Sequence, residues 1–343
     1  MRFSTPKPNL IYYKTYFALG LLMYPRRLIN LIKFKLSNFR VKVNYYPIMM
    51  DIEPTQRCNY KCLMCAPFKE KREDMAFEEF KRIIDHQFGL MEIKIQGVGE
   101  PLLNKDFFRM IKYAKRRLLW IRTTTNGSLL HINDNYKKLV DSGVHDINIS
   151  VDGATKDVYE SIRIGGNFDQ LKENCRSIND YNNRVTKTTV RAWVVLQKRN
   201  RHQFFGFPKF FSELGFKEVA YSFAMHNYGK EDENKEATTF DFEEEGFSKL
   251  FEICKGLGIK ISFFFHPQFN EKVFCQIPFK RVYVTTDSHI LPCCYIANQE
   301  VIDFGRFSDF EEIWFKKYTD FRLALKSLPK IPSFCQECYR SDK

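Results

Sequence analysis

Residues 48–65 read "IMMDIEPTQRCNYKCLMC". The apolar start predicts a buried strand that runs directly into a loop carrying Cys58, Cys62 and Cys65, and no other cysteine occurs before Cys175. A structural zinc site and a fully protein-bound iron–sulfur cubane each use four protein ligands. Three thiolates on one loop can instead hold three irons of a [4Fe–4S] cluster, which leaves the fourth iron open for a small molecule.

Strand and helix patterns alternate from this point onward. The predicted strands are 48–54, 91–95, 119–125, 146–152, 188–196, 218–223 and 259–265, and the predicted helices are 77–88, 104–117, 133–142, 155–180, 202–214 and 247–256. This alternation implies parallel βαβ units, about six in number. The expected fold class is therefore α/β, with the chemistry at the carboxyl ends of the strands.

Short glycine-containing motifs follow three of the strands. They are "GVGEPLL" (97–103), "TTNG" (124–127) and "SVDG" (150–153), and each taken singly is only a turn signal. In their order and spacing, together with Cys-x3-Cys-x2-Cys after the first strand, they resemble the radical SAM superfamily over residues 48–225. The resemblance implies a partial (β/α)6 TIM-like barrel.

The resemblance also implies a site for S-adenosylmethionine (SAM). In this family the open iron chelates SAM, and reduction cleaves it to methionine and a 5′-deoxyadenosyl radical that abstracts a substrate hydrogen atom. A ferredoxin- or flavodoxin-type reductant would supply the electron. The cluster ligands would be Cys58, Cys62 and Cys65. The positions that match the family's cofactor contacts are Met64, Gly97, Gly99, Glu100, Asn126, Ser150, Asp152 and Arg163. Val98 departs from the usual glycine, and Met64 from the usual aromatic residue.

A second group of cysteines comprises Cys275, Cys293, Cys294, Cys335 and Cys338. In isolation these thiols fit a four-cysteine zinc site as well as a cluster. Beside a radical SAM core they resemble a SPASM or twitch module with a β-hairpin, in which Ser288 replaces the expected glycine. Because few residues follow Cys338, we expect one auxiliary [4Fe–4S] cluster. Its ligands would be Cys275, Cys293, Cys335 and Cys338, with Cys294 as the alternative to Cys293.

A cluster held by four thiolates has no open iron, so we expect the auxiliary cluster to transfer electrons. A similar layout in aminocyclitol dehydrogenases suggests oxidation of a small-molecule substrate, namely a sugar, cyclitol or polyol, either free or linked to a lipid or nucleotide. The alternatives are a peptide-modifying SPASM maturase, an RNA-modifying enzyme, a redox-neutral epimerase and a non-catalytic metal-bound scaffold. Cys175 and Cys254 are expected in the core, although an epimerase would use such a thiol as hydrogen donor. His266 and Tyr221 are the candidates for a catalytic base.

The formal net charge of +13 is concentrated at the start of the chain. The first fifty residues contain nine lysines and arginines and no acidic residue. A local basic arm explains this charge better than a nucleic-acid groove. Residues 16–24 are too short an apolar run to span a bilayer. From 28 to 36, apolar and basic residues alternate at helical spacing, which fits either packing on the main domain or peripheral membrane contact through residues 14–42.

These patterns predict four segments. They are a basic amphipathic arm (1–46), the radical SAM core (47–225), an acidic linker with one helix and strand (226–270) and the auxiliary-cluster module (271–343). The start of the chain shows no signal-peptide pattern, and reduced thiols suit metal binding. We therefore expect a cytoplasmic location, with the inner membrane face as the surface for any peripheral contact.

Overall fold

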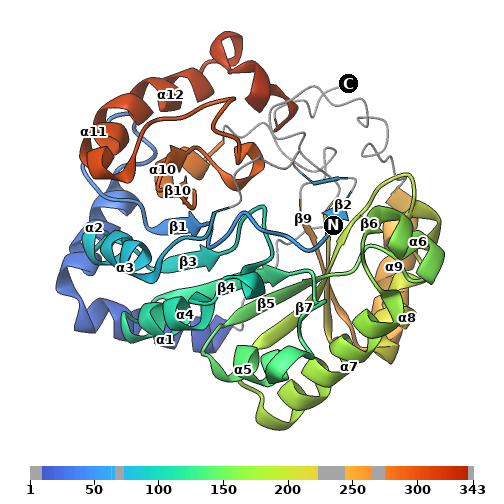
Figure 1. Ribbon diagram of the computed structural model, residues 1–343. Coiled ribbons are helices and arrows are strands. Elements are labelled where there is room, and N and C mark those ends of the chain that lie inside the picture. Colours follow the sequence, from blue (N-terminus) through green and yellow to red (C-terminus); the bar gives the residue numbers. More distant parts are fainter. Residues whose placement is uncertain (1–9, 63, 66–72, 223–243, 265–274, 339–343) are drawn as a thin grey trace.

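The computed structural model describes residues 10–62, 64–65, 73–222, 244–264 and 275–338 (Figure 1). A nine-stranded sheet has the order β11-β10-β1-β3-β4-β5-β7-β8-β9. Neighbouring strands from β10 to β9 run parallel, and only the β10–β11 pair is antiparallel. The parallel strands of the core are β1 (Met49–Ile52), β3 (Glu92–Ile95), β4 (Trp120–Thr125), β5 (Asp146–Ser150), β7 (Thr189–Val195), β8 (Glu218–Ser222) and β9 (Lys260–Phe264).

Helices line the outer side of the curved sheet (Figure 1). They are α3 (Phe77–His86), α4 (Phe107–Arg116), α5 (Asn135–Asp141), α6 (Lys156–Ile162), α7 (Phe168–Val185), α8 (Phe207–Glu213) and α9 (Glu244–Gly256). Each long helix buries one apolar stripe; α3, for example, buries Phe80, Ile83 and Ile84 against the sheet. The predicted α/β partial barrel and its strand–helix alternation are confirmed.

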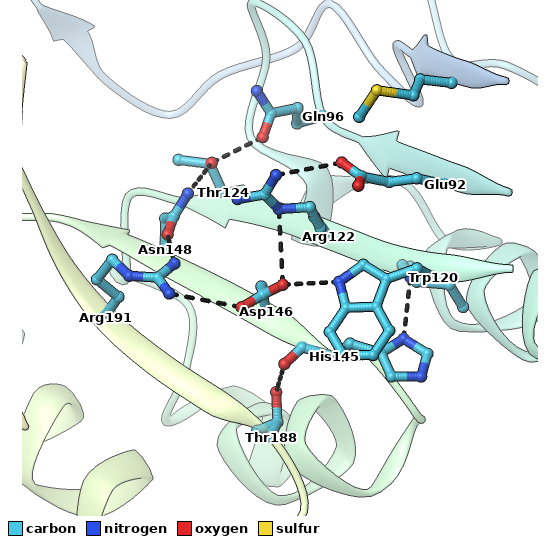
Figure 2. Close-up of polar contacts among 12 residues, drawn as sticks. Glu92, Gln96, Trp120, Arg122, Thr124, His145, Asp146, Asn148, Thr188 and Arg191 are labelled. Atoms are coloured by element: carbon cyan, nitrogen blue, oxygen red, sulfur yellow. Dashed lines mark hydrogen bonds and ion pairs between the residues drawn. The ribbon is translucent and has the colours of Figure 1, made fainter. Parts of the chain in front are cut away.

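The inner side of the sheet is polar, because alternate residues of the strands point away from the helices. Figure 2 shows the network that results. Arg122 contacts Glu92 at 3.1 Å and Asp146 at 3.6 Å, and Arg191 lies 3.5 Å from the other oxygen of Asp146. The indole nitrogen of Trp120 donates to Asp146 at 2.8 Å. Buried charges are tolerated when they are paired, and these pairs lie toward the amino ends of the strands.

The carboxyl-terminal segment joins the same sheet. Strand β10 (Arg281–Val284) pairs in parallel with β1, and β11 (Ile290–Leu291) folds back on β10. The predicted hairpin is confirmed, and Ser288 in its turn has a φ of 63°, the left-handed region that glycine adopts most readily. The short α10 (Ile277–Lys280) precedes β10, and α11 (Phe310–Glu312), a π-helical turn at 313–317 and α12 (Tyr318–Leu325) follow. The predicted segment boundaries remain predictions.

Two helices precede the barrel. They are α1 (Leu10–Met23) and α2 (Pro25–Leu36), and Pro25 opens α2, a position that proline favours. Tyr16 packs against the His145 ring and Tyr13 against Trp120, with ring centroids 4.5 and 4.8 Å apart. These contacts place α1 at the amino end of the sheet. Among the described residues, no helix combines the length and apolarity that a membrane span requires.

Candidate cofactor-binding site

A cavity of about 240 Å³ lies at the carboxyl ends of the strands. Six of the predicted site residues line it: Cys62, Met64, Cys65, Gly97, Ser150 and Arg163. Its remaining walls come from inward-facing strand residues and from the carboxyl-terminal segment, namely Lys94, Gln96, Val98, Thr124, Asn148, Trp193, Val195, Ser222, Phe264, Tyr283, Cys294, Tyr295 and Ala297. The fold therefore brings together motifs that are separated by about 100 positions in the chain.

Arg163 connects the cysteine loop to the end of β5. The short strand β2 (Lys61–Cys62) pairs with β6 (Arg163–Ile164), which sets Cys62 opposite Arg163. The guanidinium forms a buried ion pair with Asp152, with N–O distances of 2.5 and 2.7 Å, and its Nη1 lies 3.8 Å from the Cys62 sulfur. Burial raises the pKa of the Cys62 thiol, and the Arg163 charge opposes that rise. Arg163 thus favours a thiolate at Cys62.

The three thiols of this loop suit iron, because thiolates are the ligands of [4Fe–4S] clusters. Cys65 lies 4.0 Å from the Val98 carbonyl oxygen, and the Cys58 sulfur accepts from the Tyr60 amide at 3.5 Å. Within the part of the chain that the structure describes, no three His, Cys, Asp or Glu side chains already converge as a metal site. The loop therefore supplies three thiol ligands, the number that a three-cysteine cluster site requires.

Glu100 is predicted to contact SAM, and the structure gives its carboxylate internal partners. It is 2% exposed, and it accepts hydrogen bonds from the Thr125 hydroxyl and the Asn126 amide, both at 2.7 Å. Burial raises its pKa, and these bonds oppose the rise. Glu100 is not among the residues that line the cavity. Its contacts join the loop after β3 to the loop after β4, so it positions these two loops.

The two glycines of "GVGEP" are required by close packing. A Cβ atom on Gly99 would lie 2.3 Å from the Thr55 carbonyl oxygen and 2.5 Å from that of Arg57. A Cβ atom on Gly97 would lie 2.3 Å from the Glu53 side chain. The loop after β3 therefore rests directly on the backbone that leads into Cys58, and the glycines allow this approach.

Asn126 and Asp152 hold neighbouring segments in place. The side-chain amide of Asn126 donates to the side-chain oxygen of Asn59 at 2.9 Å. The side-chain amide of Asn59 in turn donates to the Ser128 hydroxyl at 2.9 Å. The second oxygen of Asp152 accepts from the Val195 amide at 2.7 Å. Both side chains are buried. Their roles as cofactor contacts remain predictions.

Sequence reasoning missed several residues that build this site. Glu53 is buried and accepts from the Val98 amide at 3.0 Å and from Tyr283 at 3.1 Å, which ties β1 to β10 and to the glycine loop. Lys94 lies on the cavity wall, where burial and then Arg281 lower the pKa of its ammonium group. Alternate residues of a strand point to the same face, so Glu92, Lys94 and Gln96 share one face of the β3 region. This alternation is the sequence signal that would have identified Lys94.

The second group of cysteines is divided between two environments. Cys293 interacts electrostatically with its neighbour Cys294 and with Cys275, and Cys335 is buried in the core. Cys294 instead lines the cavity, beside Asp51 and Lys94. Cys338 lies in the 3-10 helix Ser333–Cys338, and its side chain is outside the described residues. Adjacent cysteines thus point to different places: Cys293 toward the module and Cys294 toward the barrel interior.

Of the two base candidates, only Tyr221 is among the described residues. Tyr221 is fully buried among Phe204, Phe207 and Phe263, and it does not line the cavity. His266 lies outside the described residues, as does most of the predicted acidic linker. Cys175 and Cys254 are buried in the core, as expected.

Comparison with known families agrees with this architecture. A model of the radical SAM superfamily matches residues 52–204, and a model of the iron–sulfur cluster-binding domain called SPASM matches residues 275–339. Together these matches cover more than half of the chain.

Among curated proteins, a probable GTP 3′,8-cyclase of Methanococcus maripaludis is 38% identical over 128 residues, which are 35% of this chain and 41% of that protein. A GTP 3′,8-cyclase of Campylobacter jejuni is 37% identical over 151 residues, which are 38% of this chain and 44% of that protein. The matched region thus spans less than half the length of these relatives.

Among solved structures, Streptococcus suis SuiB bound to the precursor peptide SuiA superposes with a TM-score of 0.66 at 17% identity, covering 85% of this chain and 70% of that one. The structure of anSMEcpe with bound AdoMet superposes with a TM-score of 0.59 at 17% identity, covering 85% and 86%. These likenesses show the fold. None of the relatives named here supports the expected sugar or cyclitol substrate by its name. The chain belongs to the radical SAM superfamily, in the subgroup of enzymes that binds SAM through a [4Fe–4S] cluster and carries an auxiliary iron–sulfur cluster in a SPASM-type module.

Proposed function

We propose that this protein is a radical SAM oxidoreductase that oxidises a small polar substrate, a sugar, cyclitol or polyol unit that is free or linked to a nucleotide. The observation that carries the proposal is the wall of the cavity. Gln96, Thr124, Asn148, Ser150 and Ser222 contribute hydrogen-bonding groups to it. Such a lining suits a substrate with several hydroxyl groups.

Lys94 supports the nucleotide-linked form of the substrate. It makes no ion pair with any described residue, although Asp51 contributes electrostatically to its environment. A cation on the wall of a cavity is suited to bind a phosphate or another anionic group. Two relatives named GTP 3′,8-cyclase point to the same class of ligand.

The roles of the chain's own residues follow from the geometry. Cys58, Cys62 and Cys65 would hold the first cluster, which together with SAM supplies reductive cleavage and hydrogen-atom abstraction. Arg163 holds Cys62 toward the cavity, and Trp193 and Phe264 form an apolar wall, with ring centroids 5.4 Å apart, that excludes water. Cys275, Cys293, Cys335 and Cys338 would hold the auxiliary cluster, whose closed coordination suits electron transfer.

A peptide-modifying maturase is the second candidate, because the fold matches SuiB over most of the chain. The size of the cavity favours a small substrate over a peptide segment. An epimerase would need a hydrogen donor in the cavity, and among the described thiols other than the loop cysteines only Cys294 lines it.

We further propose two partners for this protein. A ferredoxin- or flavodoxin-type protein would supply the electron, and residues 14–42 would contact the cytoplasmic face of the membrane.

Anaerobic reconstitution tests the enzyme and its clusters. We expect about eight irons per chain and release of 5′-deoxyadenosine from SAM with dithionite. Cys62→Ala should abolish the release and lower the iron content by about half. Cys254→Ala, which removes a buried thiol that does not line the cavity, should change neither. One zinc per chain without SAM cleavage would instead identify a metal-bound scaffold.

The substrate class is tested by deuterium transfer. Deuterated nucleotide sugars, free cyclitols and peptides are supplied in turn, and the label is sought in 5′-deoxyadenosine. A product two hydrogens lighter than its substrate supports oxidation, whereas solvent deuterium at an inverted carbon identifies an epimerase. Label transfer from a peptide alone would replace the small-molecule proposal with the maturase.

A further inference from the structure

Exposed apolar side chains are concentrated on the first two helices. Of the twelve large apolar side chains that are exposed in the described residues, eight lie between Tyr12 and Leu36. They are Tyr12, Leu19, Leu22, Met23, Leu28, Ile29, Ile32 and Leu36, and we call them the α1–α2 face. Leu22 and Leu36 are 78% and 76% exposed. A concentration of exposed apolar side chains on two adjacent helices suggests an interaction site.

Helix α2 is turned with its apolar stripe outward by specific contacts. Arg27 is buried and donates to the carbonyl oxygens of Arg117 and Leu118 at 2.9 and 3.2 Å. Asn30 is buried and exchanges two hydrogen bonds with the Tyr46 backbone, at 2.7 and 2.9 Å. An ordinary surface helix buries its leucines and isoleucines and exposes its polar residues. Here two polar side chains anchor the helix together with Phe34, whose ring centroid lies 5.3 Å from that of Tyr45. The stripe of Leu28, Ile29, Ile32 and Leu36 is therefore presented to the outside.

The two helices and the segment that follows them contribute charge of one sign. No acidic residue precedes Asp51, and Lys14, Arg26, Lys33, Lys35, Arg40 and Lys42 flank the apolar residues in the chain. A cavity of about 260 Å³ opens at the junction of the two helices. Its charged lining residues are Arg26, Arg27 and Arg117, with Asp85 as the one acidic residue among those described. A second copy of the chain would bring the same positive charge to the interface, which disfavours a symmetric dimer. An anionic bilayer is complementary both to the apolar stripe and to its basic border.

We propose that the α1–α2 face docks on an anionic lipid bilayer and orients the enzyme with its cavity directed away from the membrane. The face lies at the amino ends of the strands, because Arg27 binds the loop before β4 and Asn30 binds the segment before β1. The cavity lies at the carboxyl ends, about 15–20 Å away along strands of this length. A substrate would therefore enter from the aqueous phase, which favours the nucleotide-linked form over a lipid-linked one.

Vesicle co-sedimentation of the full cluster-loaded chain tests the docking. We expect binding to phosphatidylcholine vesicles that contain about 30% phosphatidylglycerol and little binding to pure phosphatidylcholine. Leu28→Gln/Ile32→Gln/Leu36→Gln should lower the bound fraction at least tenfold. The matched control, Ile132→Gln/Leu257→Gln/Leu323→Gln, changes three comparably exposed apolar residues elsewhere and should bind as the wild type does. Lys33→Glu/Lys35→Glu should lose the preference for anionic vesicles.

The orientation of the enzyme on the bilayer is tested separately, by fluorescence quenching. Brominated lipids should quench the fluorescence of Ile32→Trp and leave that of Leu323→Trp on α12 unchanged. Three outcomes would overturn the proposal. The wild type could fail to bind anionic vesicles, or both triple variants could lose binding equally. Light scattering could also show a dimer that only the α2 triple variant abolishes. The inference rests on the proposed membrane contact and not on SAM cleavage. A chain that binds vesicles but releases no 5′-deoxyadenosine leaves the docking intact and rejects the enzymatic proposal.

Discussion

Arg163 and Cys62 lie opposite each other on two short paired strands, and the guanidinium is 3.8 Å from the thiol sulfur although the residues are 101 positions apart. The same guanidinium is paired with the fully buried Asp152. One side chain therefore positions the cysteine loop relative to the carboxyl end of β5.

Replacing Arg163 with methionine tests this link. The change keeps a long side chain but leaves the Asp152 carboxylate without its buried cation, which should cost about 3–5 kcal/mol of stability. We also expect lower iron content, because Cys62 loses its partner. Arg82→Met is the control, since its ion pair with Glu79 is on the surface and should contribute about 0–1 kcal/mol. Equal melting temperatures for the two variants would show that the Arg163–Asp152 pair does not support the fold.

Gly99→Ala should displace the cysteine loop. Its Cβ atom would meet two backbone oxygens, those of Thr55 and Arg57, which cannot rotate away. We expect destabilisation of about 1–3 kcal/mol, as for other overpacked sites, together with reduced iron loading. Gly256→Ala is the matched change, because nothing lies within 4 Å of its added methyl group. This control should be neutral or slightly stabilising in thermal unfolding, and iron loading at wild-type level in Gly99→Ala would contradict the assigned packing role.

Cys293 and Cys294 should differ in cluster loading. Cys293 faces the module near Cys275, whereas Cys294 faces the cavity beside Lys94. Cys293→Ala should therefore remove about four irons per chain, while Cys294→Ala should keep them. Iron and sulfide analysis with electron paramagnetic resonance distinguishes the two, and loss of iron in the Cys294 variant alone would exchange the assignment.

His145 should make stability depend on pH. Burial lowers the pKa of its ring to about 4 from 6.5, and its Nδ1 accepts the Ile121 amide at 2.9 Å. The unfolded chain therefore binds the proton more tightly, so the contribution of His145 is full above pH 6.5 and is lost as the pH falls toward 4. Between pH 7 and pH 5 the loss should be about 2 kcal/mol.

His145→Gln keeps an acceptor near Ile121 and removes the titration. Thermal unfolding at pH 7 and pH 5 should show a smaller drop in melting temperature for this variant than for the wild type. The groups that face the ring are Tyr12, Tyr16 and Trp120, with Asp146 and Lys115 as the nearby charges. An unchanged pH dependence would show that His145 is not its source.

Local patterns in the chain were sufficient to predict the alternating strands and helices, the three-thiol loop and the hairpin around Ser288. Periodicity reports which side chains are buried, and motif spacing reports which donor atoms share a loop. These features depend on residues that are close together in the chain, so they can be predicted before any long-range contact is known.

Other features depend on strand register and helix rotation. The parallel pairing of β10 with β1 brings Cys294 into the cavity and turns Cys293 away from it. Glu100 has internal partners because β3 and β4 end side by side. Leu28, Ile32 and Leu36 of α2 are exposed because Arg27 and Asn30 bind distant backbone groups. Periodicity distinguishes the faces of an element but not the surroundings that each face meets, and those surroundings were established only when segments far apart in the chain packed together.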